Sequence, residues 1–446
     1  MYVATPPTLS DIFGKLRAER LRVLMGSASE ARTAEYLHWD KLRHLTPPNG
    51  LTSEEWWALI KLSRQPVWRP ISLSDPDGGL FVFGMPDEVF QLLHFVDQRC
   101  SGEIAMPEVV TADDQARRHY LVNSVMEEAI RSSQLEGATT SRRVGKELLL
   151  TGRPPRDRSE QMIVNNYRAL QFIREGLGNE LTSEGVLELQ RILTDGTLDN
   201  PDAAGRLQTS SDERVAVYDR TDGSLIHRPP PAEQLPARME KMCEFANEVN
   251  EPGRFTHPVI RSVLLHFWLA YDHPFEDGNG RTARALFYWS MRKHGYWLTE
   301  YLSISRILRN APAKYTKAFL LTETDDRDIT YFIIHQLEVI RRAVEELHAY
   351  LRRKIKEVRE VERLIRGSDD FNHRQLAVLS DAIRNPERTY TFQVHAATHN
   401  VTHETARTDL SQLTAKGLLV RRKQGHRYLF NPAADLSEKL RQPAFG

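Results

Sequence analysis

The sequence predicts a mainly α-helical fold in which strands are limited to short hairpins. Apolar residues recur every three or four positions through most of residues 111–330, the period of a helix that packs one face on a core. A near-heptad apolar stripe continues through about residues 331–368. We therefore expect an all-helical central domain, preceded by a small α+β region and followed by a long helix and a small C-terminal domain.

Residues 1–110 form the predicted α+β region. Helical patterns are expected at Leu9–Leu24, Glu30–Leu45 and Ser53–Leu62. A hairpin is expected from Val67–Leu73 and Leu80–Phe83, with turn-forming residues between them. The tryptophans expected in the core, rather than on a binding platform, are Trp56, Trp57 and Trp68. The region has no catalytic signature, and its role stays open.

The composition is that of a globular chain with several domains. Of its 446 residues 40% are hydrophobic and 27% charged, and this length suggests roughly two to four domains. Its 60 basic residues equal its 60 acidic residues, so the net charge indicates no partner. Cys100 and Cys243 have neither metal nor disulfide spacing. With no signal-peptide run and no apolar stretch of membrane-spanning length, we expect a cytoplasmic protein without a membrane partner.

The most informative stretch is residues 273–284, HPFEDGNGRTAR, between two helical patterns. Gly278 and Gly280 let the backbone turn, so that their N–H groups and those of the next helical turn can form an anion nest. Arg281 and Arg284 add guanidinium groups that match phosphate oxygens. The stretch therefore predicts a phosphate cradle.

The same stretch contains a base and a metal ligand. Asp277 offers a hard carboxylate oxygen, which Mg²⁺ takes together with phosphate oxygens and water. His273 is a neutral imidazole near pH 7 and can accept a proton from an attacking hydroxyl. The combination predicts attack of a hydroxyl on phosphorus, with positioning and charge stabilisation supplying the catalysis.

This stretch resembles the Fic family signature, His-Pro-Phe-x-(Asp/Glu)-Gly-Asn-Gly-Arg-x-x-Arg, at every fixed position. The resemblance covers roughly residues 111–335 and implies a Fic domain at 111–330. It implies that His273 is the catalytic base and Asp277 the magnesium ligand. The nucleotide contacts that it implies are Phe275, Gly278, Asn279, Gly280, Arg281 and Arg284. Tyr315 is placed near the adenine on the same basis, with a core tyrosine as the alternative.

The resemblance implies a protein adenylyltransferase. Such an enzyme moves AMP from Mg-ATP to a Ser, Thr or Tyr hydroxyl of a target protein, and the target can be the chain itself. In related kinases such as Doc, a lysine replaces the second glycine of the motif, so Gly280 favours nucleotidyl transfer. Transfer of UMP, phosphate or phosphocholine is the alternative within the same fold.

A hairpin pattern at about residues 214–231 lies where the family has its flap. The flap of the family grips a target segment by main-chain pairing, a form of strand addition. The residues that would do so here are Val215, Ala216, Val217 and Tyr218.

A helical pattern at about residues 118–137 ends in a second family feature. Ser132 and Glu136 are four residues apart and share a helix face. With Gly137 they match the inhibitory pattern (Ser/Thr)-x-x-x-Glu-(Gly/Asn). The resemblance implies a Glu136–Arg284 ion pair that competes with the γ-phosphate and keeps basal transfer low. In some relatives the same glutamate helps water to remove AMP, so reversal is a second expected activity.

The apolar stripe of residues 331–368 has two interpretations. A helix packed along its own domain would bury the stripe within one chain. A coiled coil would bury it between two copies, which makes a homodimer the alternative. We favour the first interpretation.

Residues 369–435 predict a winged helix-turn-helix domain, followed by a tail at 436–446. The expected elements are helices at Asn372–Arg384, Phe392–His399 and Thr402–Lys416 and strands at Leu418–Val420 and Tyr428–Phe430. The expected DNA contacts, at the start of the third helix and on the basic wing, are Thr402, His403, Arg407, Arg421, Arg422, Lys423 and Arg427. Glu404 and Asp409 on the same helix count against DNA, and winged helices also bind proteins. A DNA-binding regulator whose Fic domain senses nucleotide is therefore the alternative function.

Overall fold

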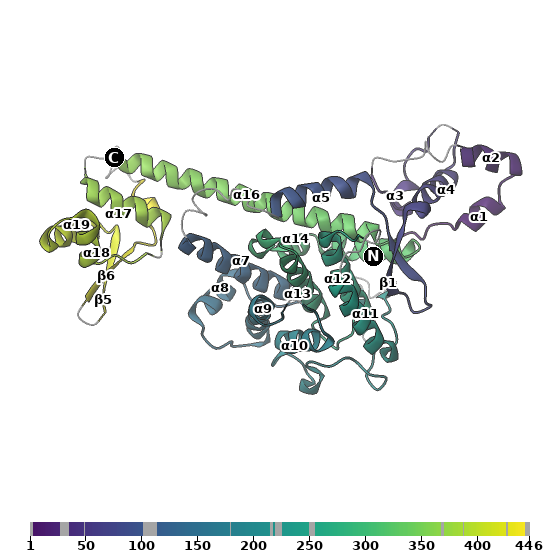
Figure 1. Ribbon diagram of the computed structural model, residues 1–446, viewed down its shortest axis with the longest axis horizontal. Helices are drawn as coiled ribbons and strands as arrows, with labels where there is room; N and C mark the ends of the chain where they lie inside the picture. Colours follow the sequence, from purple (N-terminus) through teal and green to yellow (C-terminus); the bar gives the residue numbers. More distant parts are fainter. Residues whose placement is uncertain are drawn as a thin grey trace. The chain divides into compact units, whose positions relative to one another are not determined.

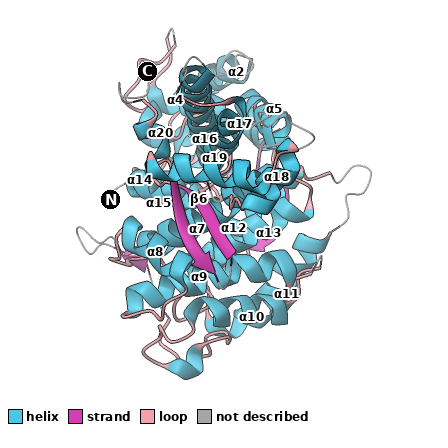
Figure 2. Cartoon of the chain, turned by 90° about the vertical axis from the view of Figure 1, so that its left-hand side faces the viewer, coloured by secondary structure: helices cyan, strands magenta, loops and turns pink. Residues whose placement is uncertain are grey.

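The computed structural model describes residues 3–26, 35–48, 50–100, 114–178, 180–214, 217–218, 225–248, 255–366, 370–386, 388–424 and 427–441. The chain divides into two compact units. The first comprises residues 1–104 and 122–344, and the second comprises residues 105–121 and 345–446. Helices dominate the described part, and its strands form antiparallel pairs (Figure 2). The predicted mainly α-helical fold is confirmed.

The N-terminal part of the first unit combines short helices with one hairpin. Its elements are α1 (Leu9–Gly14), α2 (Ala18–Gly26), α3 (Trp39–Leu42), α4 (Ser53–Arg64), the 3-10 turn η2 (Gln65–Val67), β1 (Arg69–Ser74), β2 (Leu80–Phe83) and α5 (Asp87–Cys100). Thr52 and Glu55 form a capping box that fixes the start of α4. Trp56 and Trp57 of α4 are buried, as the sequence predicts.

Two helices predicted in this part are wrong in extent. The pattern at Leu9–Leu24 forms two helices, because α1 ends at Gly14 and glycine is a poor helix former. Of the pattern at Glu30–Leu45, the described residues are helical only at Trp39–Leu42, and residues 27–34 lie outside the described part. Helix α5 is not among the predicted elements.

The hairpin β1–β2 is continuous with the central part of the first unit. Val82 of β2 forms a parallel bridge with Asp328: Val82 N–H donates to Arg327 O at 3.1 Å, and Ile329 N–H donates to Val82 O at 2.8 Å. The hairpin therefore binds the segment that begins α16 (Thr330–Arg366).

The central part of the first unit is a set of packed helices with one further hairpin (Figure 1). Its elements are α7 (Asp114–Leu135), α8 (Arg142–Thr151), α9 (Arg158–Glu175), α10 (Ser183–Thr194), η3 (Pro201–Ala203), β3 (Val217–Tyr218), β4 (Leu225–His227), η4 (Ala232–Gln234), α11 (Leu235–Asn247), α12 (Pro258–Asp272), α13 (Asn279–Lys293), η5 (Trp297–Tyr301), α14 (Ile304–Asn310) and α15 (Pro312–Thr324). Helices α12 and α13 pack against each other and are buried along almost their whole length. Helix α12 is apolar on nearly all sides, as is typical of an interior helix, and α13 is buried against it, so this pair forms the core of the unit. Among the described residues, no helix combines the length and apolar character needed to cross a bilayer.

Helix α16 is 37 residues long. Its first part, through Val344, belongs to the first unit, where Leu337, Ile340 and Val344 are buried. This part of the stripe packs within one chain. The side chains at positions 351, 355, 358, 361 and 365 lie outside the described part, so the coiled-coil alternative stays a prediction.

The second unit ends in a small domain with its own core. Its elements are α17 (His373–Arg384), α18 (Phe392–His399), α19 (His403–Ala415), β5 (Leu419–Gln424), β6 (Arg427–Pro432) and α20 (Leu436–Lys439). β5 pairs antiparallel with β6, and Tyr390 forms a bridge with Phe430. The predicted tail at 436–446 is wrong at its start, because Leu436 and Leu440 are buried in the apolar core of this domain.

Candidate active site

His273 lies at the junction between α12 and the loop that precedes α13. It is the C-cap of α12, with a left-handed backbone (φ 46°, ψ 54°), and its N–H donates to Leu269 O at 3.0 Å. The residue is half-buried. Burial, with smaller contributions from His227 and Arg214, lowers the pKa of His273 to about 4. The imidazole is therefore neutral at pH 7.

Asn279 holds the loop together through its side chain. Its Oδ1 accepts from Phe275 N–H at 2.9 Å, and its Nδ2 donates to Phe275 O at 2.8 Å. The same Nδ2 lies 3.2 Å from His273 Nδ1 and so orients the imidazole ring. Phe275 is fully buried. Its side chain anchors the loop in the core, and its role as a nucleotide contact stays a prediction.

Gly278 and Gly280 shape the start of α13. Gly278 adopts a left-handed backbone (φ 88°), and a Cβ there would lie 2.9 Å from Thr194 Cγ2. Gly278 is also the N-cap and has no side chain with which to cap the helix, so the first-turn N–H groups face the loop. A Cβ at Gly280 would overlap the Glu136 carboxylate. Both positions therefore require glycine for space, in addition to the predicted anion nest.

Asp277 fits the role of a single magnesium ligand. Its side chain is 39% exposed, and Oδ1 accepts from Gly278 N–H at 2.5 Å. Oδ2 lies 3.1 Å from Arg281 Nη2 and 3.7 Å from Arg158 Nη2. Among the described residues, no group of three His, Cys, Asp or Glu side chains could hold a metal by itself. A cation here would therefore need phosphate oxygens and water to complete its shell, as Mg²⁺ commonly does.

Arg281 is buried beneath the loop. Besides its contact with Asp277, its Nη1 donates to Leu193 O at 2.9 Å, at the end of α10. This places the guanidinium under the carboxylate and fixes the first turn of α13 against α10. A buried cation at a helix N-terminus strengthens the attraction of that end for anions.

Arg284, one turn further along α13, forms the ion pair expected from the sequence. Its Nη1 lies 2.9 Å from Glu136 Oε1. Its Nε donates to Ser132 Oγ at 2.9 Å, and its Nη2 donates to Ser132 O at 3.2 Å. Glu136 follows the last residue of α7, and Gly137 takes a positive φ of 105° that turns the chain away. Ser132 and Glu136, at the end of α7, therefore bind the buried Arg284 guanidinium on two sides.

Glu128 fastens α7 to the neighbouring α14. Its carboxylate accepts from the hydroxyls of Ser303 and Ser305, at 2.8 and 2.5 Å, and from Ser305 N–H at 3.2 Å. Burial raises the pKa of Glu128 above its usual range, despite these hydrogen bonds and nearby Arg284. No sequence pattern marks Glu128, which is one acidic residue on a long helix.

Tyr315 lies on the Arg284 side of the site. Its hydroxyl lies 2.8 Å from His266 Nε2, and its ring packs edge-on against Phe319. Arg284 and Glu136 both act on the ionisation of its hydroxyl, and burial raises the pKa of Tyr315 above its usual range. Its placement near the adenine stays a prediction.

The hairpin β3–β4 contributes two residues to the site that the sequence analysis does not single out, Arg214 and His227. Arg214 donates to the carbonyls of Asp272 and His273, and His227 lies against Tyr271 O. Of the predicted flap residues, Val215 and Ala216 lie outside the described residues. Val217 and Tyr218 form β3, and their side chains are not described. The only sequence signal for Arg214 is its place at the start of the hairpin pattern.

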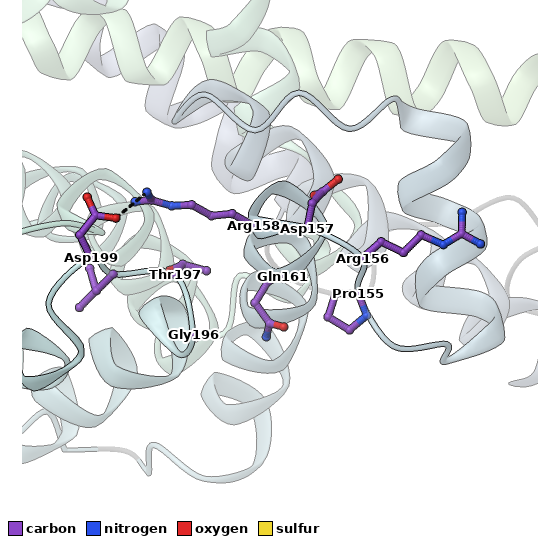
Figure 3. Close-up of a pocket in the computed structure, with 9 residues that line it drawn as sticks. Pro155, Arg156, Asp157, Arg158, Gln161, Gly196, Thr197 and Asp199 are labelled. Carbon is purple, nitrogen blue, oxygen red and sulfur yellow. Dashed lines mark hydrogen bonds and ion pairs between the residues drawn. The ribbon is translucent and has the colours of Figure 1, made fainter.

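A polar pocket of about 400 Å³ is lined by Arg158, among other residues (Figure 3). Arg158 Nη2 also lies 3.7 Å from Asp277 Oδ2. The pocket is formed by the start of α9 and the segment after α10, namely Pro155, Arg156, Asp157, Arg158, Gln161, Gly196, Thr197, Leu198 and Asp199. Arg158 crosses it to reach Asp199 at 3.2 Å. Arg158 therefore links this pocket to the predicted metal ligand.

The predicted DNA contacts lie on α19 and β5 of the C-terminal domain. Thr402 caps α19, and His403, Arg421, Arg422 and Lys423 are exposed. Arg407 lies 3.8 Å from Glu404, and both are exposed. Arg427 begins β6, and its side chain is not described.

Asp409 does not belong to the exposed face of α19. Its Oδ2 lies 2.7 Å from Arg374 Nε and 3.1 Å from His395 Nε2, and the side chain is 3% exposed. Hydrogen bonds from Arg374, Asn372 and His395 outweigh its desolvation and lower the pKa of Asp409 to about 2. The expectation that Asp409 weakens DNA binding is therefore wrong: this charge is neutralised inside the domain.

Known proteins match the central part of the chain. Residues 180–291 match the Fic/DOC family. The protein adenylyltransferase Fic of Nematostella vectensis is 31% identical over 121 residues, which are 26% of this chain and 25% of that protein. That of Drosophila willistoni is 37% identical over 130 residues, which are 29% of this chain and 23% of that protein. The chain thus spans about a quarter of the length of these curated relatives.

A solved structure extends the likeness to the fold. The crystal structure of a Fic family protein from Desulfovibrio desulfuricans G20 covers 78% of this chain and 96% of its own, with a TM-score of 0.51 and 18% identity. The family match includes α12, the whole loop of residues 273–284 and most of α13. The segment that carries His273 and Arg284 is therefore similar to a Fic domain in sequence, and the helical core around it is similar to a Fic family protein in fold.

Proposed function

We propose that the chain is an auto-inhibited protein adenylyltransferase. The observation that carries this proposal is the convergence of His273, Asp277 and Arg284 on one loop and one helix turn. A hydroxyl oxygen of the target attacks the α-phosphorus of ATP, and the bond from that phosphorus to the bridging oxygen of the β-phosphate breaks. Pyrophosphate leaves, AMP stays on the target, and the hydroxyl proton passes to His273.

The environment of His273 suits it to this role. Its lowered pKa, about 4, keeps the ring unprotonated at neutral pH, so that it can accept a proton without first losing one. Asn279 holds the His273 ring in one orientation, so that less rotational freedom is lost when the ring is aligned for proton transfer. The target segment would lie along the hairpin β3–β4, whose strands end beside His273.

ATP would bind over the first turn of α13. Its phosphates would contact the N-terminus of α13 and Arg281, and its γ-phosphate would bind Arg284. Asp277 would hold Mg²⁺, which supplies charge neutralisation for the phosphates. In the described structure Glu136 and Ser132 already occupy Arg284. A carboxylate at this place repels a γ-phosphate, so the same geometry supports the proposed brake.

The test is transfer of label from ATP labelled at the α-phosphate. We expect Glu136→Gly to raise labelling roughly 5- to 150-fold over the wild type, the range of a coupling free energy of 1–3 kcal/mol. Glu136→Gly/His273→Ala is the matched control and should lose the gain. Equal labelling of the wild type and Glu136→Gly would overturn the brake.

The same assay separates the alternatives. Labelling from γ-labelled ATP, from UTP or from CDP-choline, with none from α-labelled ATP, would replace adenylyl transfer by phosphate, UMP or phosphocholine transfer. Loss of label from a modified target on incubation with unlabelled wild-type chain would show the reverse reaction. The family match begins at residue 180, after Glu136, so the brake depends on the mutant assay alone.

A second candidate function is DNA binding by the C-terminal domain. The observation that favours it is the burial of Asp409, which leaves the exposed cations of β5 without that opposing charge. We expect the Arg421→Ala/Arg422→Ala/Lys423→Ala variant to bind a mixed duplex more weakly. The slope of the logarithm of its binding constant against the logarithm of the salt concentration should become shallower, by an amount that corresponds to the loss of up to about three phosphate contacts. Arg388→Ala, whose cation pairs with Asp381 in the same domain, is the control. Binding that this triple variant leaves unchanged would contradict the proposal.

A further inference from the structure

The last carbonyl groups of α12 have no N–H donors within the helix, because the chain turns at His273. These are the carbonyls of Tyr271, Asp272 and His273. A helix C-terminus is also the negative end of the helix dipole, so cationic donors are the favoured partners there. Among the described residues, side-chain donors to these three carbonyls come from Arg214 and His227, at the ends of the hairpin β3–β4.

Arg214, which precedes β3, binds two of the three carbonyls. Its Nη2 donates to Asp272 O at 2.9 Å, and its Nη1 donates to His273 O at 3.0 Å. Its Nε donates to Pro230 O at 3.0 Å, on the far side of the hairpin. One planar guanidinium therefore ties both ends of the hairpin to the turn that contains the base.

His227, the last residue of β4, binds the third carbonyl. Its Nε2 donates to Tyr271 O at 2.7 Å, and its Nδ1 lies 3.0 Å from Glu323 Oε2. The side chain is 6% exposed. The end of α12 is thus contacted by Arg214, before β3, and by His227, at the end of β4.

The turn needs such support because His273 is in a left-handed conformation. For a residue with a Cβ this conformation costs on the order of 1–2 kcal/mol, so it persists only where the surroundings fix it. The carbonyl of His273 itself is one of the two that Arg214 binds. Loss of the Arg214 hydrogen bonds to Asp272 O and His273 O would let the backbone at His273 relax and move the imidazole.

We propose that Arg214 is a positioning residue that fixes His273 for proton transfer and couples it to the target-binding hairpin. The proposal rests on the proposed transferase function, because it gives His273 the role of base. A target segment that binds the hairpin would then also act on the base, through the contacts of Arg214 with Pro230 O and His273 O.

Arg214 also sets the charge that His273 meets. Burial and the charges of His227 and Arg214 lower the pKa of the His273 imidazole. The charges of Glu136 and Asp277 raise it. Removal of the Arg214 cation therefore raises the pKa of His273. A lysine at this position keeps the cation but cannot present the planar fork that reaches two carbonyls at once.

The experiment compares Arg214→Lys and Arg214→Met in the Glu136→Gly background. We expect kcat to fall about 10- to 100-fold in both, because a displaced base misses the hydroxyl proton, while KM for ATP stays unchanged. The acid limb of the pH profile should move to higher pH in Arg214→Met and stay in place in Arg214→Lys. Arg206→Met is the matched control: its guanidinium pairs with Asp212 in the same segment, and its described contacts do not include the end of α12.

A second measurement keeps the inference testable without turnover. The imidazole of His273, assigned by its loss in His273→Ala, is titrated by NMR in each variant. A pKa that rises in Arg214→Met, but not in Arg206→Met, supports the proposal. An unchanged pKa together with unchanged kcat, or the same changes in Arg206→Met, would overturn it. Absence of transfer in the Glu136→Gly background would instead refute the transferase function, and the titration would still decide whether Arg214 sets the state of His273.

Discussion

Gly280 lies where α13 meets the end of α7, and its lack of a side chain makes room for the Glu136 carboxylate. A Cβ at this position would overlap Glu136 and lie 3.1 Å from Arg284 Nη1. The family resemblance implies a role for this glycine toward phosphate, and the structure adds the space that it leaves for Glu136. These two features predict different effects of one substitution.

We expect Gly280→Ala to destabilise the wild type more than the Glu136→Gly variant. The added methyl group meets Glu136 only when that side chain is present, so the two substitutions should be non-additive by about 0.5–3 kcal/mol, as is usual for residues in contact. Thermal unfolding of the wild type, both single variants and the double variant measures this coupling. Additive shifts in Tm would show that Glu136 does not lie against position 280.

Much of the site is predictable from single residues, because its chemistry is concentrated in one uninterrupted stretch. His273, Asp277 and Arg284 follow from residue type and spacing, and the partner of Arg284 follows from the family resemblance. Arg214 and Glu128 do not, because their partners lie 59 and 177 residues away in the chain and no local pattern marks them. The burial of the Phe275 side chain does not follow either, because a motif position does not reveal which way a side chain points.

At the scale of elements, α11 and α12 are joined by a buried ion pair. Arg238 Nη2 lies 2.6 Å from Asp272 Oδ1, and both side chains are less than a tenth exposed. Arg238 also donates to Ser74 O at 2.6 Å, which ties β1 to the same point. Burial raises the pKa of Asp272 above its usual range, against the effect of Arg238. This pair fixes the end of the helix that carries the base.

We expect Arg238→Met to lower the free energy of unfolding by about 3–5 kcal/mol, because it leaves the buried Asp272 carboxylate without its partner. Urea denaturation at pH 7 measures the loss. Arg238→Met/Asp272→Asn should recover part of it, since the uncompensated charge is then removed. If Arg238→Met/Asp272→Asn is as unstable as Arg238→Met, the loss of stability comes from lost packing and not from the uncompensated charge.

Elements were predicted well where the pattern is long and poorly where it is interrupted. The long helix and the strand β2 lie where the sequence places them. Helix α5 was missed although Val89, Leu92 and Val96 have helical spacing and are buried. Helix α20 was missed because one turn with two apolar residues is too short for periodicity to show.

At the scale of the molecule, several histidines of the first unit are held neutral by burial. The pKa of His38, His273 and His335 is lowered to about 4 in each case, and that of His266 to about 3. Their ordinary value is about 6.5, so between these limits the unfolded chain binds more protons than the folded one. Protonation therefore favours unfolding as the pH falls.

We expect Tm to fall steadily as the pH is lowered from about 6.5 toward 4, with little effect of these histidines above pH 7. His266→Phe should reduce the slope, because it removes one of the buried bases in a site lined by Phe287 and Phe332. Thermal unfolding monitored at a series of pH values tests this. A slope that is the same in this variant would assign the acid sensitivity to other groups.

The way α7 ends has a consequence for the proposed brake. Glu136 lies beyond the last helical residue, its N–H reaches Ser132 O only at 3.4 Å, and the exposed Gly137 follows. Terminal turns of this kind fray, with opening free energies well below that of global unfolding. Release of Arg284 then requires one turn to open, while Glu128 keeps the rest of α7 bound to α14. Under the proposed brake, amide hydrogen exchange at this turn would report the fraction of molecules in which Arg284 is released. Solutes or substitutions that favour fraying would then change activity without any change in the loop of residues 273–284.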